Sequence, residues 1–255
     1  MIYIFLPIAA LLTSILSGML GMGGGMLLLA ALFSCGMPHA EVIPAHAAVQ
    51  LVSNSTRTLA FWRQVDWRTV RRFLLGVLPG GLLGILVMVV LGRPEGSQPI
   101  LKIIIGVYIL TMAALPTRRD ARVRPFTWWD FPLLGLVAGT AAFTVGAIGP
   151  LIAPLFARRD FVKERLIATK AVCQVLLHLA KIPVFLALLT FDDLAALGLV
   201  TMIMAIVVVP GTLIGKRFLR RLSARGFVSL YRTALLVAGA KVLLLDGVWA
   251  ALRAT

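Results

Sequence analysis

Residues 46–57 read HAAVQLVSNSTR and residues 170–181 read KAVCQVLLHLAK. Each stretch is mostly apolar but carries polar residues at positions i, i+4, i+8 and i+11, which fall on one face of a helix. The two sets keep one offset, because 46 and 170, 50 and 174, 54 and 178, and 57 and 181 are each 124 positions apart. The residues of the first polar stripe are His46, Gln50, Asn54 and Arg57, and those of the second are Lys170, Gln174, His178 and Lys181. The duplicated stripes predict a two-fold repeat with a polar centre.

Composition places these stripes in a membrane. The chain has 255 residues, of which 60% are hydrophobic and 14% charged, against about 25% charged in an average soluble domain. Several apolar runs approach the ~20 residues that a helix needs to cross a bilayer. We therefore predict an all-α polytopic membrane protein, in which intramembrane polar residues mark a pathway or a binding site. Met1–Ile15 has no basic start, so we expect the first apolar segment to remain rather than to be cleaved.

The apolar runs form four segments in each half of the chain. They are Ile2–Phe33, Val42–Trp62, Phe73–Leu91 and Ile100–Leu115, then Phe131–Phe156, Leu166–Leu189, Ala195–Gly215 and Phe227–Leu252. We expect an N-terminal membrane repeat over residues 1–115, a cytoplasmic linker over 116–126 and a C-terminal membrane repeat over 127–255. The third segments share a second motif, PGGLLG at 79–84 and PGTLIG at 210–215. Glycine and proline there permit close helix approach and local kinks.

The net charge of +15 lies mainly in the loops. This follows the positive-inside rule for cytoplasmic loops and argues against nucleic-acid binding. In the first half, a basic loop follows the second apolar segment. In the second half, the basic loop comes before the second apolar segment. Corresponding loops of the two halves therefore lie on opposite sides of the membrane, and we expect inverted repeats. Inversion requires residues 131–156 to enter and leave on one face, as a re-entrant hairpin, with residues 2–33 as its counterpart. We expect six full spans, two hairpins and both termini outside. Eight full spans are the alternative.

Each expected hairpin is interrupted by glycine. The two tips cover residues 21–25, GMGGG, and 145–150, VGAIGP. Glycine lets backbone N–H groups approach a ligand, and the N-terminal ends of half-helices favour an anion. Close helix packing is the alternative explanation for such glycines. The candidate binding glycines are Gly23, Gly24, Gly25, Gly146 and Gly149.

The stripes provide the stronger candidates for a binding site. Gln50 and Gln174 are the identical members, and each amide offers two donors. Lys170, Lys181 and Arg57 supply positive charge, although each also has the alternative of reaching toward an interface. His46 and His178 titrate near neutral pH when unperturbed, and Asn54 and His178 have the alternative of joining helices. Together the stripes predict a donor-rich, cationic lining for an oxyanion.

No catalytic motif of the hydrolase, metalloprotease, redox or nucleotide-binding type occurs in the sequence. We therefore predict no enzyme activity, no cofactor and no metal, and we interpret Cys35 and Cys173 as packing residues. The first hypothesis is a secondary transporter of a small anion. An anion-selective channel with the same lining is the second, and an intramembrane enzyme or structural membrane subunit is the third. The sequence does not predict the oligomeric state.

Several motifs resemble those of the TauE/SafE family of sulfite exporters. The resemblance is carried by GMLGMGGG at 18–25, by the turn CGMP at 35–38, by residues 45–54 and by the paired PGxLxG motifs, and it covers essentially the whole chain. It implies an inner-membrane secondary transporter of sulfur-containing anions such as sulfite, sulfonates or related organosulfur acids, with export as the direction. The second tip departs from the glycine-rich pattern, because Ala147 and Ile148 occupy the places of Gly23 and Gly24.

Overall fold

The computed structural model of the chain describes residues 2–21, 23–37, 39–92, 98–114, 127–144, 148, 149, 152, 156, 163–188, 191–218, 223, 229, 233 and 236–254. Within these residues the secondary structure is helical and contains no strand. This agrees with the all-α prediction. The predicted linker over 116–126 lies outside the described residues.

The helices follow the predicted segments. In the first half they are α1 (Ile2–Leu20), α2 (Gly24–Ser34), α3 (His39–Ala60), the short 3-10 helix η1 (Trp62–Gln64), α4 (Trp67–Gly92) and α5 (Gln98–Ala114). In the second half they are α6 (Asp130–Thr144), α8 (Lys163–Leu188), α9 (Phe191–Phe218), η3 (Val242–Val248) and α11 (Trp249–Ala254). Sequence periodicity did not predict that η3 is a π-helix. Such wide turns are rare and occur mostly as short insertions within α-helices.

The first apolar segment is broken by its glycines. Gly21 has a φ of 65° and Gly23 a φ of 92°, a left-handed backbone that glycine adopts without steric penalty. A Cβ atom at Gly24 would overlap the carbonyl oxygen of Thr13, so the start of α2 folds back onto α1. The 11 residues of α2 extend over about 16 Å at 1.5 Å per residue, which is too short to cross a bilayer.

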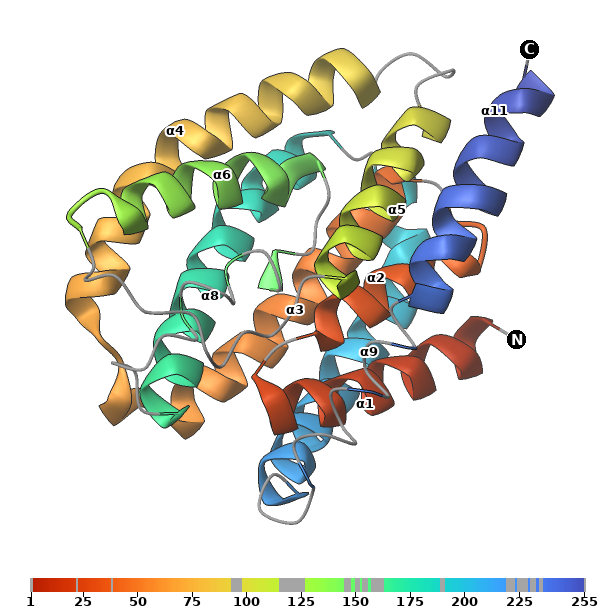
Figure 1. The fold of residues 1–255 in the computed structure, drawn as a ribbon. Helices are drawn as coiled ribbons and strands as arrows, with labels where there is room; N and C mark the ends of the chain where they lie inside the picture. Colours follow the sequence, from red (N-terminus) through yellow and green to blue (C-terminus); the bar gives the residue numbers. More distant parts are fainter. Residues whose placement is uncertain are drawn as a thin grey trace.

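The two halves exchange their packing partners. Helix α1 of the first half packs along α9 of the second, and α4 of the first half packs along α6 of the second, while α3 and α8 pack against each other at the centre (Figure 1). Helix α5 packs on η3. The first helix of each half therefore obtains its main partner from the third segment of the other half.

The PGxLxG motifs form both exchanged contacts. A Cβ atom at Gly80 of α4 would overlap the carbonyl oxygen of Leu136 in α6, and one at Gly215 of α9 would overlap the carbonyl oxygen of Ile15 in α1. The backbones touch at these points because no side chain intervenes. The prediction that these motifs permit close helix approach is therefore confirmed.

We expect Gly80→Ala and Gly215→Ala to destabilise the protein by about 1–3 kcal/mol each, because the added methyl groups meet backbone atoms that have no free rotation. Gly198→Ala is the matched control, since a Cβ atom there would meet no atom within 4 Å, and helix propensity alone favours alanine by about 1 kcal/mol. Thermal unfolding of the purified variants in detergent measures the difference. Equal melting temperatures for the three variants would contradict this packing.

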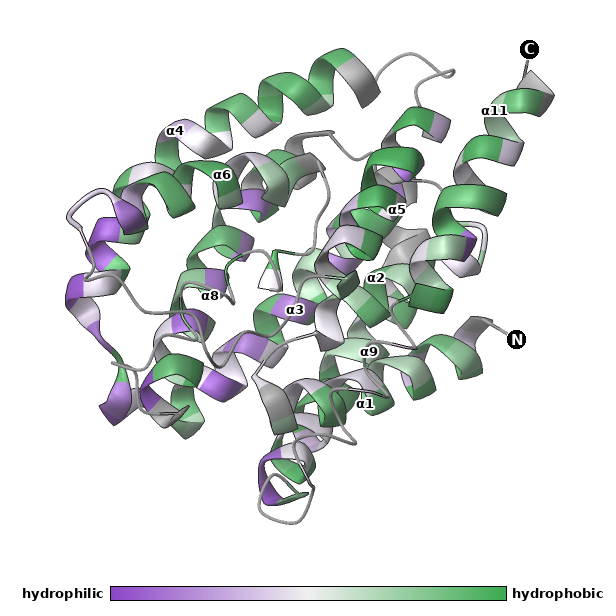
Figure 2. Cartoon of the chain, viewed as in Figure 1, coloured by the Kyte–Doolittle hydropathy of each residue, from purple (hydrophilic) through white to green (hydrophobic). Residues whose placement is uncertain are grey.

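The outer helices present apolar faces. Along α4 the side chains of Leu75, Leu78, Leu82 and Leu86 are 59%, 64%, 70% and 59% exposed, and these positions lie on one side of the helix. Hydrophobic residues dominate the outer helices α4 and α5, whereas hydrophilic residues occur along α3 and α8 (Figure 2). An exposed apolar face of this size fits a lipid environment.

Length and apolar composition identify two described helical segments that are able to cross a membrane, Trp67–Val90 and Gly198–Phe218. Four shorter apolar helical segments accompany them, at Tyr3–Met19, Gly24–Ser34, Lys102–Thr111 and Asp130–Phe143. Helix α3 has the length of a span but lacks the apolar composition, because it carries the first polar stripe.

A polar contact also joins the two halves, at the start of α4. Asp66 caps this helix, since Thr69 donates its backbone N–H to Oδ1 at 3.5 Å and its hydroxyl to Oδ2 at 3.0 Å. Arg165 at the start of α8 pairs with Asp66 Oδ2 at 2.7 Å. The backbone N–H of Asp66 donates to the hydroxyl oxygen of Thr169 at 2.9 Å. One carboxylate thereby fixes the start of α4 to the helix that carries the second polar stripe.

Burial acts to raise the pKa of Asp66, but the hydrogen bonds from Arg165 and Thr69 outweigh it and hold that pKa below its ordinary value. A carboxyl with a lowered folded-state pKa contributes stability above its unfolded pKa of about 4, and this contribution is lost as pH falls through the folded value. We expect Asp66→Asn to lower the free energy of unfolding at pH 7 by about 1 kcal/mol, because Arg165 is half exposed. The difference in melting temperature from the wild type should shrink as pH falls below about 4 and disappear below the folded-state pKa of Asp66. A difference that stays constant with pH would contradict this assignment.

Candidate functional site

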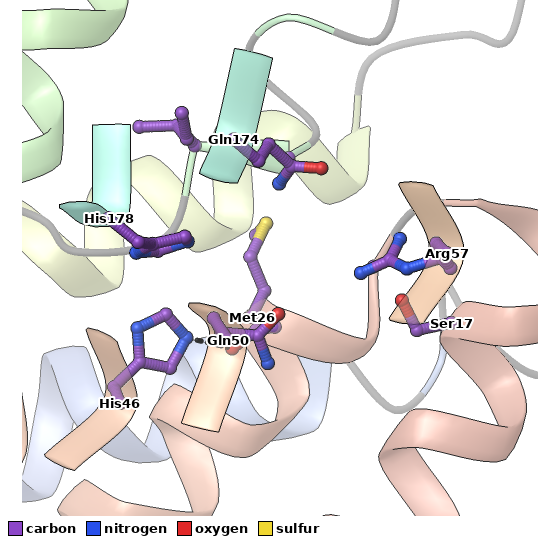
Figure 3. Close-up of a pocket in the computed structure, with 11 residues that line it drawn as sticks. Ser17, Met26, His46, Gln50, Arg57, Gln174 and His178 are labelled. Carbon is purple, nitrogen blue, oxygen red and sulfur yellow. Dashed lines mark hydrogen bonds between the residues drawn. The ribbon is translucent and has the colours of Figure 1, made fainter. Parts of the chain in front are cut away.

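Residues from both polar stripes and both glycine tips surround one small cavity at the centre of the protein (Figure 3). Its volume is about 10 Å³, which is about the room that one water molecule needs. The lining residues are Ser17, Gly23, Gly25, Met26, His46, Gln50, Arg57, Ile148, Gly149, Gln174 and His178. The structure thus brings together residues that are far apart in the sequence, around a space with room for about one water molecule.

Each glutamine of the stripes lies against the glycine tip of its own half. A Cβ atom at Gly25 would lie 3.1 Å from Gln50 Oε1, and one at Gly149 would lie 3.4 Å from Gln174 Nε2. The two glycines are 124 positions apart, as are the two glutamines. The repeat offset that the stripes define therefore extends to the contact between tip and stripe.

The stripes meet in opposite order along α3 and α8. The rings of His46 and His178 have centroids 6.1 Å apart at an interplanar angle of 69°. Gln50 and Gln174 lie next to them, with Arg57 and Ser17 on the other side of the glutamines (Figure 3). Position 46 of the first stripe therefore faces position 178 of the second, not its repeat equivalent at 170.

His46 also holds the first glycine tip. Its Nε2–H donates to the carbonyl oxygen of Gly25 at 2.9 Å. A carbonyl only accepts, so Nε2 carries the proton and Nδ1 of the neutral ring is an acceptor. His46 Nδ1 is buried and has no hydrogen-bond partner among the described residues. This ring thus links α3 to the broken helix while keeping one nitrogen unoccupied.

Two fully enclosed cations lie on the other side of the glutamines. Arg57 donates from Nη2 to Asn54 Oδ1 at 2.7 Å and is 3% exposed. Lys170 is 0% exposed and its Nζ has no hydrogen-bond partner among the described residues. The two positive charges lie close enough to repel each other. Of the described carboxylates, none lies within ion-pair distance of either cation.

The other predicted residues have different positions. Asn54, Lys170 and Lys181 are fully buried but are absent from the cavity lining. The positive charge of Lys181 acts on both imidazole rings. Gly24 contacts Thr13 and Ser17 of α1, so it has a packing role rather than a lining role. Gly146 lies outside the described residues, as does the rest of the second tip except Ile148 and Gly149.

Sequence reasoning missed three lining residues, Ser17, Met26 and Ile148. Ser17 follows Thr13 and Ser14 in an apolar helix, and this cluster of hydroxyls was an available signal. Thr13 and Ser14 donate to backbone carbonyls of α1. Met26 and Ile148 are apolar residues of apolar segments, and nothing in their spacing distinguishes them from packing residues.

The described residues contain no group of three or more His, Cys, Asp or Glu side chains that would hold a metal ion. Comparison with known proteins found no match among curated proteins. The family described as "Sulfite exporter TauE/SafE" matches residues 6–242, which is nearly all of the 255 residues. The resemblance inferred from the glycine tip and the PGxLxG motifs is thereby confirmed. The chain belongs to the TauE/SafE sulfite exporter family, whose members are membrane transporters and not enzymes.

Proposed function

We propose that the chain is a secondary transporter that exports a small sulfur-containing oxyanion across the inner membrane by alternating access. Gln50 and Gln174 bind the oxygens of the anion, the backbone of the glycine tips adds donors, and Lys170 and Arg57 supply the attraction for negative charge. His46, His178, Asn54 and Lys181 line or tune the same site. Sulfite, sulfonates and related organosulfur acids share the required chemistry.

The observation that carries this proposal is the buried ammonium group of Lys170, which has no hydrogen-bond partner among the described residues. A buried charge without a partner is strongly unfavourable, and intramembrane charges normally pair or face a pathway. Arg57 adds a second positive charge nearby. The described residues offer these groups no carboxylate, and we propose that an anion entering from outside the protein is their partner.

The exchanged packing supports an inverted two-fold repeat. With an offset of 124, position 46 is equivalent to 170 and position 178 to 54. The contact between His46 and His178 supports a two-fold relation in which Asn54 would lie near Lys170, and Gln50 would lie opposite Gln174 near the axis. The reciprocal contacts of α1 with α9 and of α4 with α6 obey the same relation. Inverted repeats around a central site are the usual architecture of secondary transporters.

The break between α1 and α2 supports the hairpin form of that architecture. The chain reverses at Gly21–Gly23 and the short α2 returns along α1, as a re-entrant hairpin would. We propose six full spans, two hairpins and both termini outside, with residues 1–115 and 127–255 as the two repeats and residues 116–126 as a cytoplasmic linker.

Alternating access is favoured by the size of the cavity. A volume of about 10 Å³ leaves no room for a sulfur oxyanion. The lining must therefore move apart to admit the ligand, as it would if the halves moved relative to each other in alternating access. A channel with the same lining would require a continuous wet path, and it predicts electrodiffusive current in a planar bilayer in place of saturable flux.

We expect Gln50→Ala combined with Gln174→Ala to abolish uptake of labelled sulfite into liposomes. Each lost hydrogen bond to a charged ligand is worth about 1.5–3 kcal/mol, or at least about tenfold in affinity. Gln64→Ala is the matched control, because this exposed glutamine lies in η1 away from the cavity. Unchanged transport in the double variant would contradict the assigned site, and single-channel current in the wild type would support the channel instead.

We expect Lys170→Met to stabilise the ligand-free protein and at the same time to weaken binding of the anion. Replacing an unpartnered buried ammonium by an apolar side chain of similar length should raise the free energy of unfolding of the ligand-free protein by about 1–3 kcal/mol. The same variant should lose the rise in melting temperature that sulfite causes in the wild type. Lys102→Met, at a partly exposed lysine of α5, should change neither quantity. Destabilisation by Lys170→Met would show that its ammonium already has a partner within the protein.

A further inference from the structure

Several buried polar atoms in and behind the cavity lining have no hydrogen-bond partner among the described residues. Behind the lining, toward Arg57, they are the donors Lys170 Nζ and Asn54 Nδ2, and in the lining itself Gln174 Oε1 is an unpartnered amide oxygen. On the other side lies His46 Nδ1, which is an acceptor because Nε2–H is used by Gly25. His46 is 1% exposed. The site therefore has buried donors behind the glutamines and an unpartnered acceptor, His46 Nδ1, in the lining itself.

The acceptor end is a second feature that an anion alone does not explain. An oxyanion oxygen satisfies Lys170 and Asn54, but it has no proton to give to His46. Protonation of His46 would instead place another buried cation within range of Lys181, whose charge already acts on this ring. The unpartnered acceptor is thus best satisfied by a donor that arrives with the ligand.

We propose that the transported anion carries a hydrogen-bond donor, a hydroxyl or ammonium group, and that His46 is the specificity-determining residue that accepts from it. The inference rests on the proposed function and adds a chemical requirement to it. The donor has two possible sources. One is the protonated oxygen of a singly protonated oxyanion. The other is a hydroxyl or ammonium group on a short chain attached to the anionic group. Both present the same proton to Nδ1.

His178 lies beside this acceptor without replacing it. Its ring lies edge-on to that of His46, and its own Nδ1 is also unpartnered among the described residues. The hydrogen bond to Gly25 fixes the orientation of His46 alone. Because Gly25 belongs to the tip that contacts Gln50, a ligand held by His46 is also placed against the donors of that tip.

Three sulfonates that share the anionic group test the requirement. They are ethanesulfonate, 2-hydroxyethanesulfonate and 2-aminoethanesulfonate, and their dissociation constants are measured by calorimetry on the full-length protein in detergent. We expect the hydroxyl and ammonium ligands to bind at least about tenfold more tightly than ethanesulfonate, because a site built around a hydrogen bond rejects the ligand that lacks it. The dissociation constant of sulfite is measured at two pH values, one below and one above its second ionisation. Tighter binding at the lower pH would show that the proton of hydrogen sulfite also donates to His46 Nδ1.

Two variants locate the effect. In His46→Leu the preference for the hydroxyl and ammonium ligands should fall to about onefold, while ethanesulfonate affinity changes by less than about threefold. His46→Asn should restore part of the preference, since an amide both donates to Gly25 and accepts. Lys170→Met should weaken all three ligands by a similar factor and leave their ratio unchanged.

The outcomes separate this inference from the proposed function. Tight and equal binding of all three sulfonates by the wild type would overturn the donor requirement and leave the anion site standing. A preference that persists in His46→Leu would overturn the assignment to His46. Failure of the wild type to bind any of the sulfonates or sulfite would overturn the anion site itself.

Discussion

The structure depends on burying positive charge where the described residues supply no negative charge to meet it. Lys170 and Arg57 lie side by side in an enclosed centre, and their mutual repulsion opposes the packing of α3 against α8. Helix α3 is held from other sides by apolar contacts and by polar links, such as Ser53 with Thr212 of α9 at 3.2 Å. The anion that we propose would relieve the repulsion at the centre.

The helix pairs around α3 and α8 make it possible to bury the polar stripes at the centre of the protein. The exchanged contacts of α1 with α9 and of α4 with α6 bring backbones together through glycine, and close backbone approach is the main source of helix association in lipid. These pairs leave α3 and α8 shielded from the bilayer. The polar stripes are thus enclosed by tightly packed helix pairs and are spared the penalty of facing hydrocarbon.

Periodicity predicted much of this arrangement because it is a local property. The stripes, the break at Gly21–Gly23 and the close-packing motifs are all visible within a few helical turns of sequence. The partners of those motifs are not, because nothing in PGTLIG at 210–215 specifies α1 as its neighbour. The pairing of Asp66 with Arg165 was missed for the same reason, since it joins residues 99 positions apart. Ser17 became a lining residue only through the packing of α1 beside the tip.

The exchange of partners between halves also has a consequence for biosynthesis. Helix α1 is the first to leave the ribosome, yet its glycine-rich partner α9 ends only at Phe218. The first polar stripe likewise has no second stripe to pack against until α8, which ends at Leu188, has been made. Contacts between distant parts of a chain form late, and incomplete intermediates expose surfaces that invite misassembly. The insertion machinery must therefore shelter a half-built protein whose first polar stripe lacks its partner while α4 to α8 are still being made.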